Sequence, residues 1–152
     1  GDGSIWLASD AGLQRIVETG DLIPGQLGPR RVVSVEHMSG TVNERGQVLL
    51  GLATDQGFGY WVREADGTLL NVASSGDLFS LDGGVPRVID SPSAQFNDLG
   101  QVATTLIFTD GTSLVARYSI VPEPSSWALV TIATACFAGL RVRRYWSARQ
   151  VA

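Results

Sequence analysis

The sequence is short of several residues that common functional sites need. Its 152 residues include one cysteine, one histidine and no lysine, so all eleven basic residues are arginine. Cys136 has no second thiol to pair with, which excludes an intramolecular disulfide and a cysteine-based metal site. No helical hydrophobic periodicity of any length precedes residue 121. The stability of the soluble part must therefore come from packing and hydrogen bonds.

Charge divides the chain into an acidic part and a basic tail. Residues 1–121 hold 14 acidic residues against 7 arginines, a net charge of −7, and residues 122–152 hold 1 against 4, a net charge of +3, which together give −4. An acidic surface repels a phosphate backbone, so we exclude nucleic acid as a partner. The chain also lacks an initial methionine and opens inside a strand-like pattern, so we expect a C-terminal piece of a longer protein.

The last thirty or so residues have the pattern of a membrane-inserting tail. Sixteen residues without a charge, Ser125 to Leu140, follow the stiff tripeptide Pro122-Glu123-Pro124. The run is slightly short for a span, where about 20 residues are usual, and its length alone also fits a buried core helix. Its flanking aromatic residues, Trp127 and Tyr145, are about 27 Å apart along a helix, the spacing of two interfacial belts. We therefore expect a transmembrane helix over residues 126–140.

A cluster of arginines orients this helix. Arg141, Arg143 and Arg144 follow the apolar run directly. Basic residues beside a span stay in the cytoplasm, so residues 141–152 are expected to form a cytoplasmic tail. The N-terminal part of the chain then lies outside the membrane.

The order of these parts resembles a known export signal. Pro122-Glu123-Pro124, a short apolar span and then Arg141-Val142-Arg143-Arg144 resemble the PEP-CTERM sorting signal of Gram-negative bacteria that make exopolysaccharide. The resemblance covers residues 121–146, and the chain departs from the usual pattern by continuing to Ala152. It implies that an exosortase-type enzyme in the inner membrane recognises the tripeptide and removes the tail, which then acts as an address and not as an anchor.

The acidic part repeats itself with a period of about 55 residues. Matching pairs are Trp6 and Trp61, Gly12 and Gly67, Val17 and Val72, Asp21 and Asp77, Asn43 and Asn97, and Gly46 and Gly100, at offsets of 54 to 56. A third copy opens where Gly57 and Arg63 align with Gly111 and Arg117. Self-similarity at such a period is typical of stacked repeat architectures.

Short strands separated by turns fill each period. The β-branched and aromatic runs that predict strands are residues 4–9, 13–18, 30–36 and 47–54 in the first copy and 60–64, 68–74, 86–91 and 101–108 in the second. Asp-Gly pairs such as Asp66-Gly67 and Asp110-Gly111 separate them. We therefore predict an all-β fold of four-stranded units of about 55 residues, stacked as propeller blades or as another β-repeat array.

Two equivalent Asn-x-x-Gly segments predict hairpin turns. Asn43 and Asn97 suit the first position of a type I turn, and Gly46 and Gly100 suit the last, where a bulge needs a positive φ. Asparagine and acidic side chains in a loop can also bind Ca²⁺. Neither segment has the alternating oxygen ligands of a calcium loop, so we predict turns and no metal site.

These turns resemble the repeats of surface proteins that carry an Asn-x-x-Gly-x-x-Ala-Phe signature. The match is to Asn43, Gly46, Asn97, Gly100 and Ala103, and the chain departs from the signature at its end in both copies. Such proteins carry varied C-terminal sorting tails, PEP-CTERM among them. This resemblance brings with it no known enzymatic activity.

The sequence shows no catalytic motif. His37 is the only histidine and no Gly-x-Ser-x-Gly elbow is present, so we expect a loop or strand-edge residue there. A glycosidase needs only two carboxylates, but 14 acidic residues make such a pair uninformative. The Gly-Asp pairs ending in Asp21 and Asp77 recur with the period, which favours structural turns over a ligand site. Trp6 and Trp61 could stack on sugars, but their equivalence favours a core layer.

The expected organisation has four parts: a β-repeat region over residues 1–118, a linker with the sorting motif over 119–125, the transmembrane helix over 126–140 and the basic tail over 141–152. We predict a non-enzymatic protein without a cofactor, passing through the inner membrane to the cell surface or extracellular space. Its role there is structural or adhesive, and its partners are the exosortase-type enzyme and exopolysaccharide. The alternative is the C-terminal part of an extracellular enzyme whose active site lies upstream. Open sheet edges should make two units alone poorly stable or prone to aggregation.

Overall fold

The structure, a computed structural model, describes residues 3–10, 12–35, 41–81 and 83–119. These residues form strands, turns and bends without an α-helix, which confirms the predicted all-β class. Within these ranges no helix has the length and apolar character that a membrane crossing requires. The predicted transmembrane helix over 126–140 and the basic tail after it lie outside the described residues.

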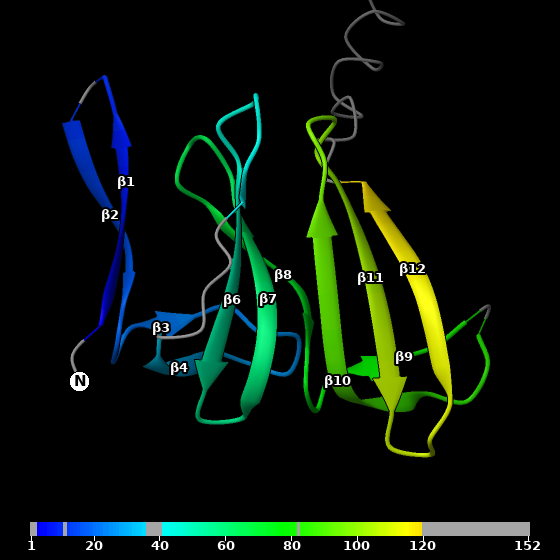
Figure 1. Cartoon of the computed structure of the whole chain (residues 1–152). Helices are drawn as coiled ribbons and strands as arrows, with labels where there is room; N and C mark the ends of the chain where they lie inside the picture. Colours follow the sequence, from blue (N-terminus) through cyan, green and yellow to red (C-terminus); the bar gives the residue numbers. More distant parts are fainter. Residues whose placement is uncertain (1–2, 11, 36–40, 82, 120–152) are drawn as a thin grey trace, which may run out of the picture. The chain divides into compact units, whose positions relative to one another are not determined.

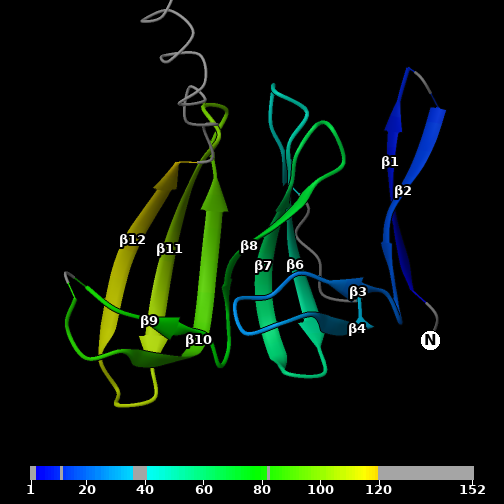
Figure 2. The same cartoon turned by 180° about the vertical axis from the view of Figure 1, so that it is seen from behind.

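The described strands form three antiparallel sheets (Figures 1 and 2). In chain order the strands are β1 (Ser4–Ser9), β2 (Gly12–Glu18), β3 (Leu22–Ile23), β4 (Arg30–Ser34), β5 (Thr41–Val42), β6 (Val48–Thr54), β7 (Gly57–Arg63), β8 (Leu69–Ser74), β9 (Leu78–Phe79), β10 (Arg87–Phe96), β11 (Gln101–Phe108) and β12 (Ser113–Ser119). The first sheet pairs β1 with β2. The second has the order β3-β4-β6-β7-β8 with β5 beside β6, and the third has the order β12-β11-β10-β9.

Every run that was predicted as a strand overlaps one. The two-residue strands β3, β5 and β9 are too short to show a periodicity, and β12 lies in the segment assigned to an incomplete third copy. β10 runs to Phe96, past its predicted end at residue 91, although Pro92 cannot donate a hydrogen bond. β9 pairs only with Arg87 and Val88, so Pro92 has one neighbouring strand and its missing N–H is tolerated.

The first sheet repeats the last two strands of the second. β1 pairs with β2 and β7 pairs with β8, and each pair contains a bulge, between Ile5 and Trp6 in the first and between Tyr60 and Trp61 in the second. The two bulges are offset by one repeat period. β1 and β2 therefore correspond to β7 and β8, and within the described residues they lack the strands that precede β7 in the larger sheet.

The predicted alignment of a third copy is wrong by one residue. Val48 lies opposite Arg63, whereas its equivalent Val102 lies opposite Tyr118. Arg63 therefore corresponds to Tyr118, and Arg117 corresponds to the fully buried Val62. The register differs because Thr54 and Gly57 pair across two residues, whereas the Phe108 N–H donates to the Thr112 carbonyl across three.

Two buried clusters occupy equivalent places in successive copies. The first contains Val17, Ile23, Val32 and Leu52, and the second contains Ala73, Ile89 and Leu106 with Phe79 packed against them. A third cluster of Leu49, Val62 and Val102 joins the second and third sheets. Full burial of each Val, Leu or Ile side chain contributes about 1.5–3 kcal/mol, so these clusters dominate the packing energy.

The two faces of the third sheet differ in character. Along β11, Val102, Leu106 and Phe108 are buried, while the alternate residues Thr105 and Ile107 are exposed. The other exposed residues of this outer face are Ser91, Ser93, Gln95, Ala103, Ser113, Val115, Arg117 and Ser119. Ala103 and Arg117 here replace Leu49 and Val62, the apolar residues that the second sheet buries against the third. The third sheet therefore has one face for packing and one for water.

Candidate functional site

The two Gly-Asp turns are closed by the same hydrogen bond. Asp21 Oδ2 accepts from the backbone N–H of Glu18 at 2.9 Å, and Asp77 Oδ2 accepts from the backbone N–H of Ser74 at 2.8 Å. The glycine before each aspartate donates to a strand that follows, at 2.8 and 2.7 Å. These contacts confirm that the Gly-Asp pairs are structural turns.

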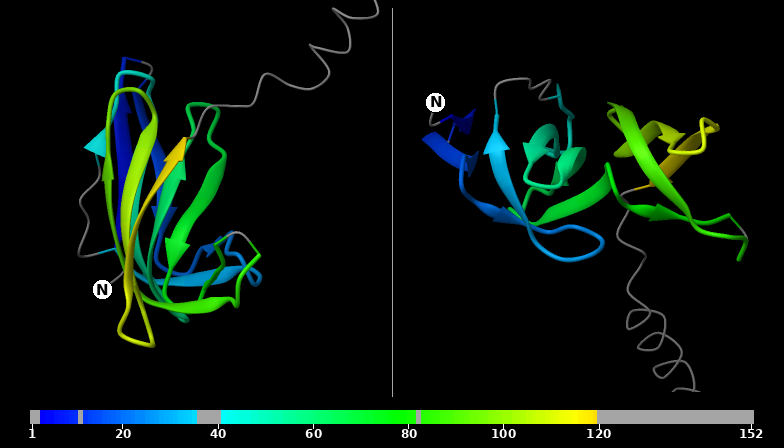
Figure 3. Two further views of the ribbon diagram at one scale, coloured as in Figure 1. Left: turned by 90° about the vertical axis from the view of Figure 1, so that its right-hand side faces the viewer. Right: turned by 90° about the horizontal axis from the view of Figure 1, so that it is seen from below.

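The loop between β3 and β4 reaches from the first copy to the second (Figure 3). We call residues 24–30, which are this loop and the first residue of β4, the linking loop. Gln26 binds the main chain of Leu78 twice, since its Nε2 donates to the Leu78 carbonyl at 2.8 Å and its Oε1 accepts from the Leu78 N–H at 2.7 Å. Arg30 donates to the Ser75 carbonyl at 2.9 Å and to Asp77 Oδ1 at 2.6 Å. The side chains of one copy therefore hold the Gly-Asp turn of the next.

The linking loop also covers Trp61. The indole Nε1 donates to the Pro24 carbonyl at 2.6 Å, and the side chain is fully buried. The tight path of the loop requires glycine at position 25, because an added Cβ would lie 2.7 Å from the Gly28 carbonyl and 2.8 Å from Arg30 Nε. One loop thus contacts four residues of the next copy, Trp61, Ser75, Asp77 and Leu78, and we call this set of contacts the joint.

The ion pair in the joint is buried. The side chains of Arg30 and Asp77 are 1% and 4% exposed. Burial raises the pKa of Asp77, and this effect exceeds the opposing effects of the Arg30 charge and of the Ser74 hydrogen bond. Within the described ranges, Arg30 Nε is buried without a hydrogen-bond partner. Either charge left alone here would destabilise the fold strongly.

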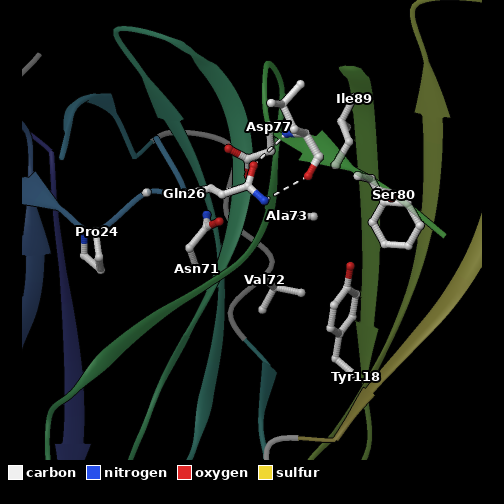
Figure 4. Close-up of a pocket in the computed structure, with 12 residues that line it drawn as sticks. Pro24, Gln26, Asn71, Val72, Ala73, Asp77, Ser80, Ile89 and Tyr118 are labelled. Carbon is white, nitrogen blue, oxygen red and sulfur yellow. Dashed lines mark hydrogen bonds between the residues drawn. The ribbon is translucent and has the colours of Figure 1, made fainter. Parts of the chain in front are cut away.

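A cavity of about 560 Å³ lies beside the joint (Figure 4). Residues of the linking loop, β8, β9, β10 and β12 line it. Figure 4 shows the Tyr118 hydroxyl pointing from β12 toward Ala73, and the bonds of Gln26 to the main chain of Leu78 close the far side. Burial raises the pKa of Tyr118, and the negative charge of Asp77 adds to the rise. The polar lining of the cavity therefore consists mainly of a neutral phenol, the Asp77 carboxyl group and the amides of Gln26 and Asn71.

The turns at Asn43 and Asn97 are built alike. In each, the Asn Oδ1 accepts from the backbone N–H groups two and four residues ahead, at 3.0 and 3.0 Å in the first turn and at 3.1 and 2.9 Å in the second. Gly46 and Gly100 end the turns with φ values of 73° and 75°. Asn43 is buried and also donates to the Asn97 carbonyl at 3.4 Å, whereas Asn97 is exposed. The two turns therefore lie side by side.

Trp6 does not lie in a core layer, so this part of the prediction is wrong. Its side chain is 54% exposed, and its Nε1 donates to Ser4 Oγ at 2.9 Å. The prediction holds for Trp61, which packs with Ile23 and Leu50 of its own sheet. Trp6 lacks this cover because the part of the chain that the structure describes has no strand on the outer edge of β1.

Several predicted functional residues lie outside the described residues. They are the sorting residues Pro122, Glu123 and Pro124, the orienting residues Arg141, Arg143 and Arg144, and His37. In the ranges that are described, no three His, Cys, Asp or Glu side chains are grouped so that they could hold a metal ion.

Sequence reasoning did not identify Gln26 and Arg30 as the residues of the joint. The one available signal is a Pro-Arg pair at the start of two equivalent strands, Pro29-Arg30 and Pro86-Arg87. It does not reveal their different environments, since Arg30 is buried, whereas Arg87 is half-exposed and lies near Asp110. Burial of an arginine depends on a partner 47 residues away, which a local pattern cannot show.

Comparison with known proteins places the chain in a family. No curated protein and no solved structure matches it. The model of a family of unknown function, DUF7453, matches residues 1–128, which is most of the chain. The chain therefore belongs to the DUF7453 family.

Proposed function

We propose that the chain is a non-enzymatic exported protein of the cell surface or extracellular matrix, sorted through a PEP-CTERM tail. The observation that carries this proposal is the order of Pro122-Glu123-Pro124, the uncharged run to Leu140 and the arginines from Arg141 to Arg144. In this proposal the run forms a transmembrane helix over 126–140, and the arginines keep its end in the cytoplasm.

The β-rich part is proposed to be an array of four-stranded units of about 55 residues, stacked like propeller blades or in another β-repeat arrangement. The repeated bulges, turns and clusters support this arrangement. The exposed outer face of the third sheet, which carries serine and threonine side chains and Arg117, supports a unit at the end of the array, since terminal repeats need a face for water.

Processing follows from the position of the motif. An exosortase-type enzyme reads Pro122-Glu123-Pro124 at the outer boundary of the inner membrane, and the mature protein ends near residue 121. The released protein then has a structural or adhesive role in the exopolysaccharide layer. Serine and threonine side chains on the outer face of β10 to β12 are suited to contact a hydrated polysaccharide.

Mass spectrometry of the protein expressed in a Gram-negative bacterium that has an exosortase-type enzyme tests this proposal. We expect the extracellular form to end near residue 121, and Glu123→Gln to trap a full-length form in the membrane. Glu44→Gln is the matched control, since it removes an exposed acid that is not part of the motif and should leave processing unchanged. Replacing Arg141, Arg143 and Arg144 by glutamine should instead act before cleavage. It should lower the fraction of chains that insert with their C-terminus in the cytoplasm.

Three results would contradict this proposal. A soluble extracellular form that still carries Trp127 to Arg144 would rule out processing. A full-length form that stays in the membrane of the unaltered strain would instead indicate a plain single-span anchor. Hydrolytic activity in the released protein would favour the alternative, in which this chain is the end of an extracellular enzyme.

A further inference from the structure

The surface that the linking loop covers in the joint has an uncovered equivalent one repeat period earlier in the chain. The linking loop contacts Trp61, Asp77 and Leu78. Subtracting 55 or 56 residues leads to Trp6, Asp21 and Leu22. We call these three residues the receiving face. The main chain of the receiving face has the same shape as that of the joint. It has the same bulge beside the tryptophan, and its aspartate accepts the same backbone hydrogen bond within its turn.

Each member of the receiving face lacks the contact that its counterpart has. Trp6 is 54% exposed, whereas Trp61 is covered by the Pro24 carbonyl. No described cation lies within ion-pair distance of Asp21, whose Oδ1 corresponds to the oxygen that binds Arg30 in the joint. No side chain of the described part binds the main chain of Leu22, which is 62% exposed.

We propose that the receiving face docks a further unit of the same repeat, placed ahead of Gly3. In the docked state, a backbone carbonyl of that unit's linking loop accepts a hydrogen bond from the indole N–H of Trp6. A glutamine of the loop binds the main chain of Leu22, and an arginine forms an ion pair with Asp21. Two observations support this occupant. The joint in the chain is the same interface in its filled form, and the unpaired carboxylate of Asp21 complements an arginine.

A second copy of this chain does not offer a matching surface at its other end. The loop that corresponds to the linking loop has Ser80 and Leu81 where the first copy has Pro24 and Gly25. Its arginine, Arg87, already donates to Thr112 at 3.0 Å and lies 5.7 Å from the ring centre of Phe108. The outer face of the third sheet also places Arg117 where the second sheet has buried Val62.

An extended chain tests the docking of a unit. Residues 20–57 are repeated directly ahead of Gly3 in place of Gly1 and Asp2, which supplies the strands and the linking loop that precede β7 in the second sheet. Hydroxyl-radical labelling followed by mass spectrometry then reports each tryptophan separately. In the full chain we expect strong labelling of Trp6 and little of Trp61. In the extended chain we expect Trp6 labelling to fall to the level of Trp61.

Two charge variants show whether the arginine contact is specific. Arg30→Glu in the added segment alone places two acids together, so labelling of Trp6 should return. Adding Asp21→Asn in the original segment removes this repulsion and keeps an oxygen for the turn bond to the Glu18 N–H, so part of the protection should be restored. The joint at Asp77 is unchanged in all of these chains, and Trp61 serves as the internal standard.

Two outcomes would overturn the proposal. One is unchanged labelling of Trp6 in the extended chain, whether or not the added strands fold. The other is loss of Trp6 labelling in the unextended chain as its concentration rises, which would assign the face to a second copy. The proposal rests on the repeat units of the proposed function but not on the tail, so failure of processing would leave it intact.

Discussion

The turns at Asp77 and Asp21 have the same sequence pattern and the same internal hydrogen bond, but they differ in what covers them. At Asp77 the linking loop brings Arg30 into a buried ion pair, and at Asp21 no described cation is present. Trp61 and Trp6 differ in the same way, since one is fully buried and the other is half-exposed. Repetition of sequence therefore sets the local geometry of a turn or bulge, while burial depends on the neighbouring copy.

The largest difference is expected between the two tryptophans. Trp61→Ala should destabilise the fold by about 3–5 kcal/mol, because it leaves a large cavity and removes the bond to Pro24. Trp6→Ala should change stability by about 0.5 kcal/mol or less, as is usual for an exposed side chain. Urea unfolding of the full chain in mild detergent, followed by circular dichroism, measures both. Equal losses would show that the two sites are equally packed.

A similar difference is expected between the two aspartates. Asp77→Asn should cost about 3 kcal/mol, because the amide leaves the buried Arg30 charge without a counter-ion. Asp21→Asn retains an oxygen for the turn and should cost about 0.5 kcal/mol or less. The same unfolding measurement applies. A cost for Asp21→Asn as large as for Asp77→Asn would show that Asp21 has a cationic partner after all.

The two asparagine turns should differ less. Asn43→Ala removes an acceptor for two backbone N–H groups from a buried site and should cost about 2 kcal/mol. Asn97→Ala removes the same bonds from an exposed site, where water replaces them, and should cost about 1 kcal/mol. Melting temperatures of the two variants should preserve this order. The reverse order would indicate that the second turn is the more buried one.

The smallest expected effect is a change in the titration of Tyr118. Burial and the Asp77 charge both raise the pKa of its phenol. Asp77→Asn removes the charge, so the pKa should fall while remaining above its usual value, and Asp21→Asn should leave it unchanged. Ultraviolet difference titration against a Tyr118→Phe baseline isolates this group. A pKa that is insensitive to Asp77→Asn would mean that the carboxylate does not act on the phenol.

The raised pKa of Tyr118 also makes the stability of the fold depend on pH, because folding favours the neutral phenol. The folded state holds the phenolic proton more tightly than the unfolded chain, so Tyr118 contributes stability below its unfolded pKa. That contribution is lost as the pH rises through the raised folded pKa. Above about pH 10, where the phenol of the unfolded chain begins to lose its proton, stability should therefore fall slightly less in Tyr118→Phe than in the unaltered chain.

Much of the fold was predictable because the longer strands have a visible composition. The runs from residue 47 to 54 and from 101 to 108 are rich in apolar and β-branched residues. The first became a strand that is buried on both faces and the second a strand that is buried on one. The Asn-x-x-Gly turns were also visible, since a positive φ at Gly46 or Gly100 is a local requirement. Two-residue strands such as β3 carry no such signal.

The residues of the joint were not predictable for a different reason. Gln26 acts on Leu78, which is 52 residues away, and Arg30 acts on Asp77, so their roles depend on how two copies pack. The repeat period also suggested equal burial for Trp6 and Trp61, although the packing around them differs. The register of β12 shifted by one residue because a single extra turn residue is enough to displace a strand.

Amide hydrogen exchange at Leu78 tests most directly whether the linking loop holds the next copy. The Leu78 N–H donates to Gln26 Oε1 at 2.7 Å, whereas no described side chain binds the main chain of Leu22. We predict that the Leu78 amide is protected in the full chain, that Gln26→Ala abolishes this protection, and that the Leu22 amide exchanges equally fast in both chains. Protection of Leu78 that survives Gln26→Ala, or equal protection of Leu22 and Leu78, would contradict the account.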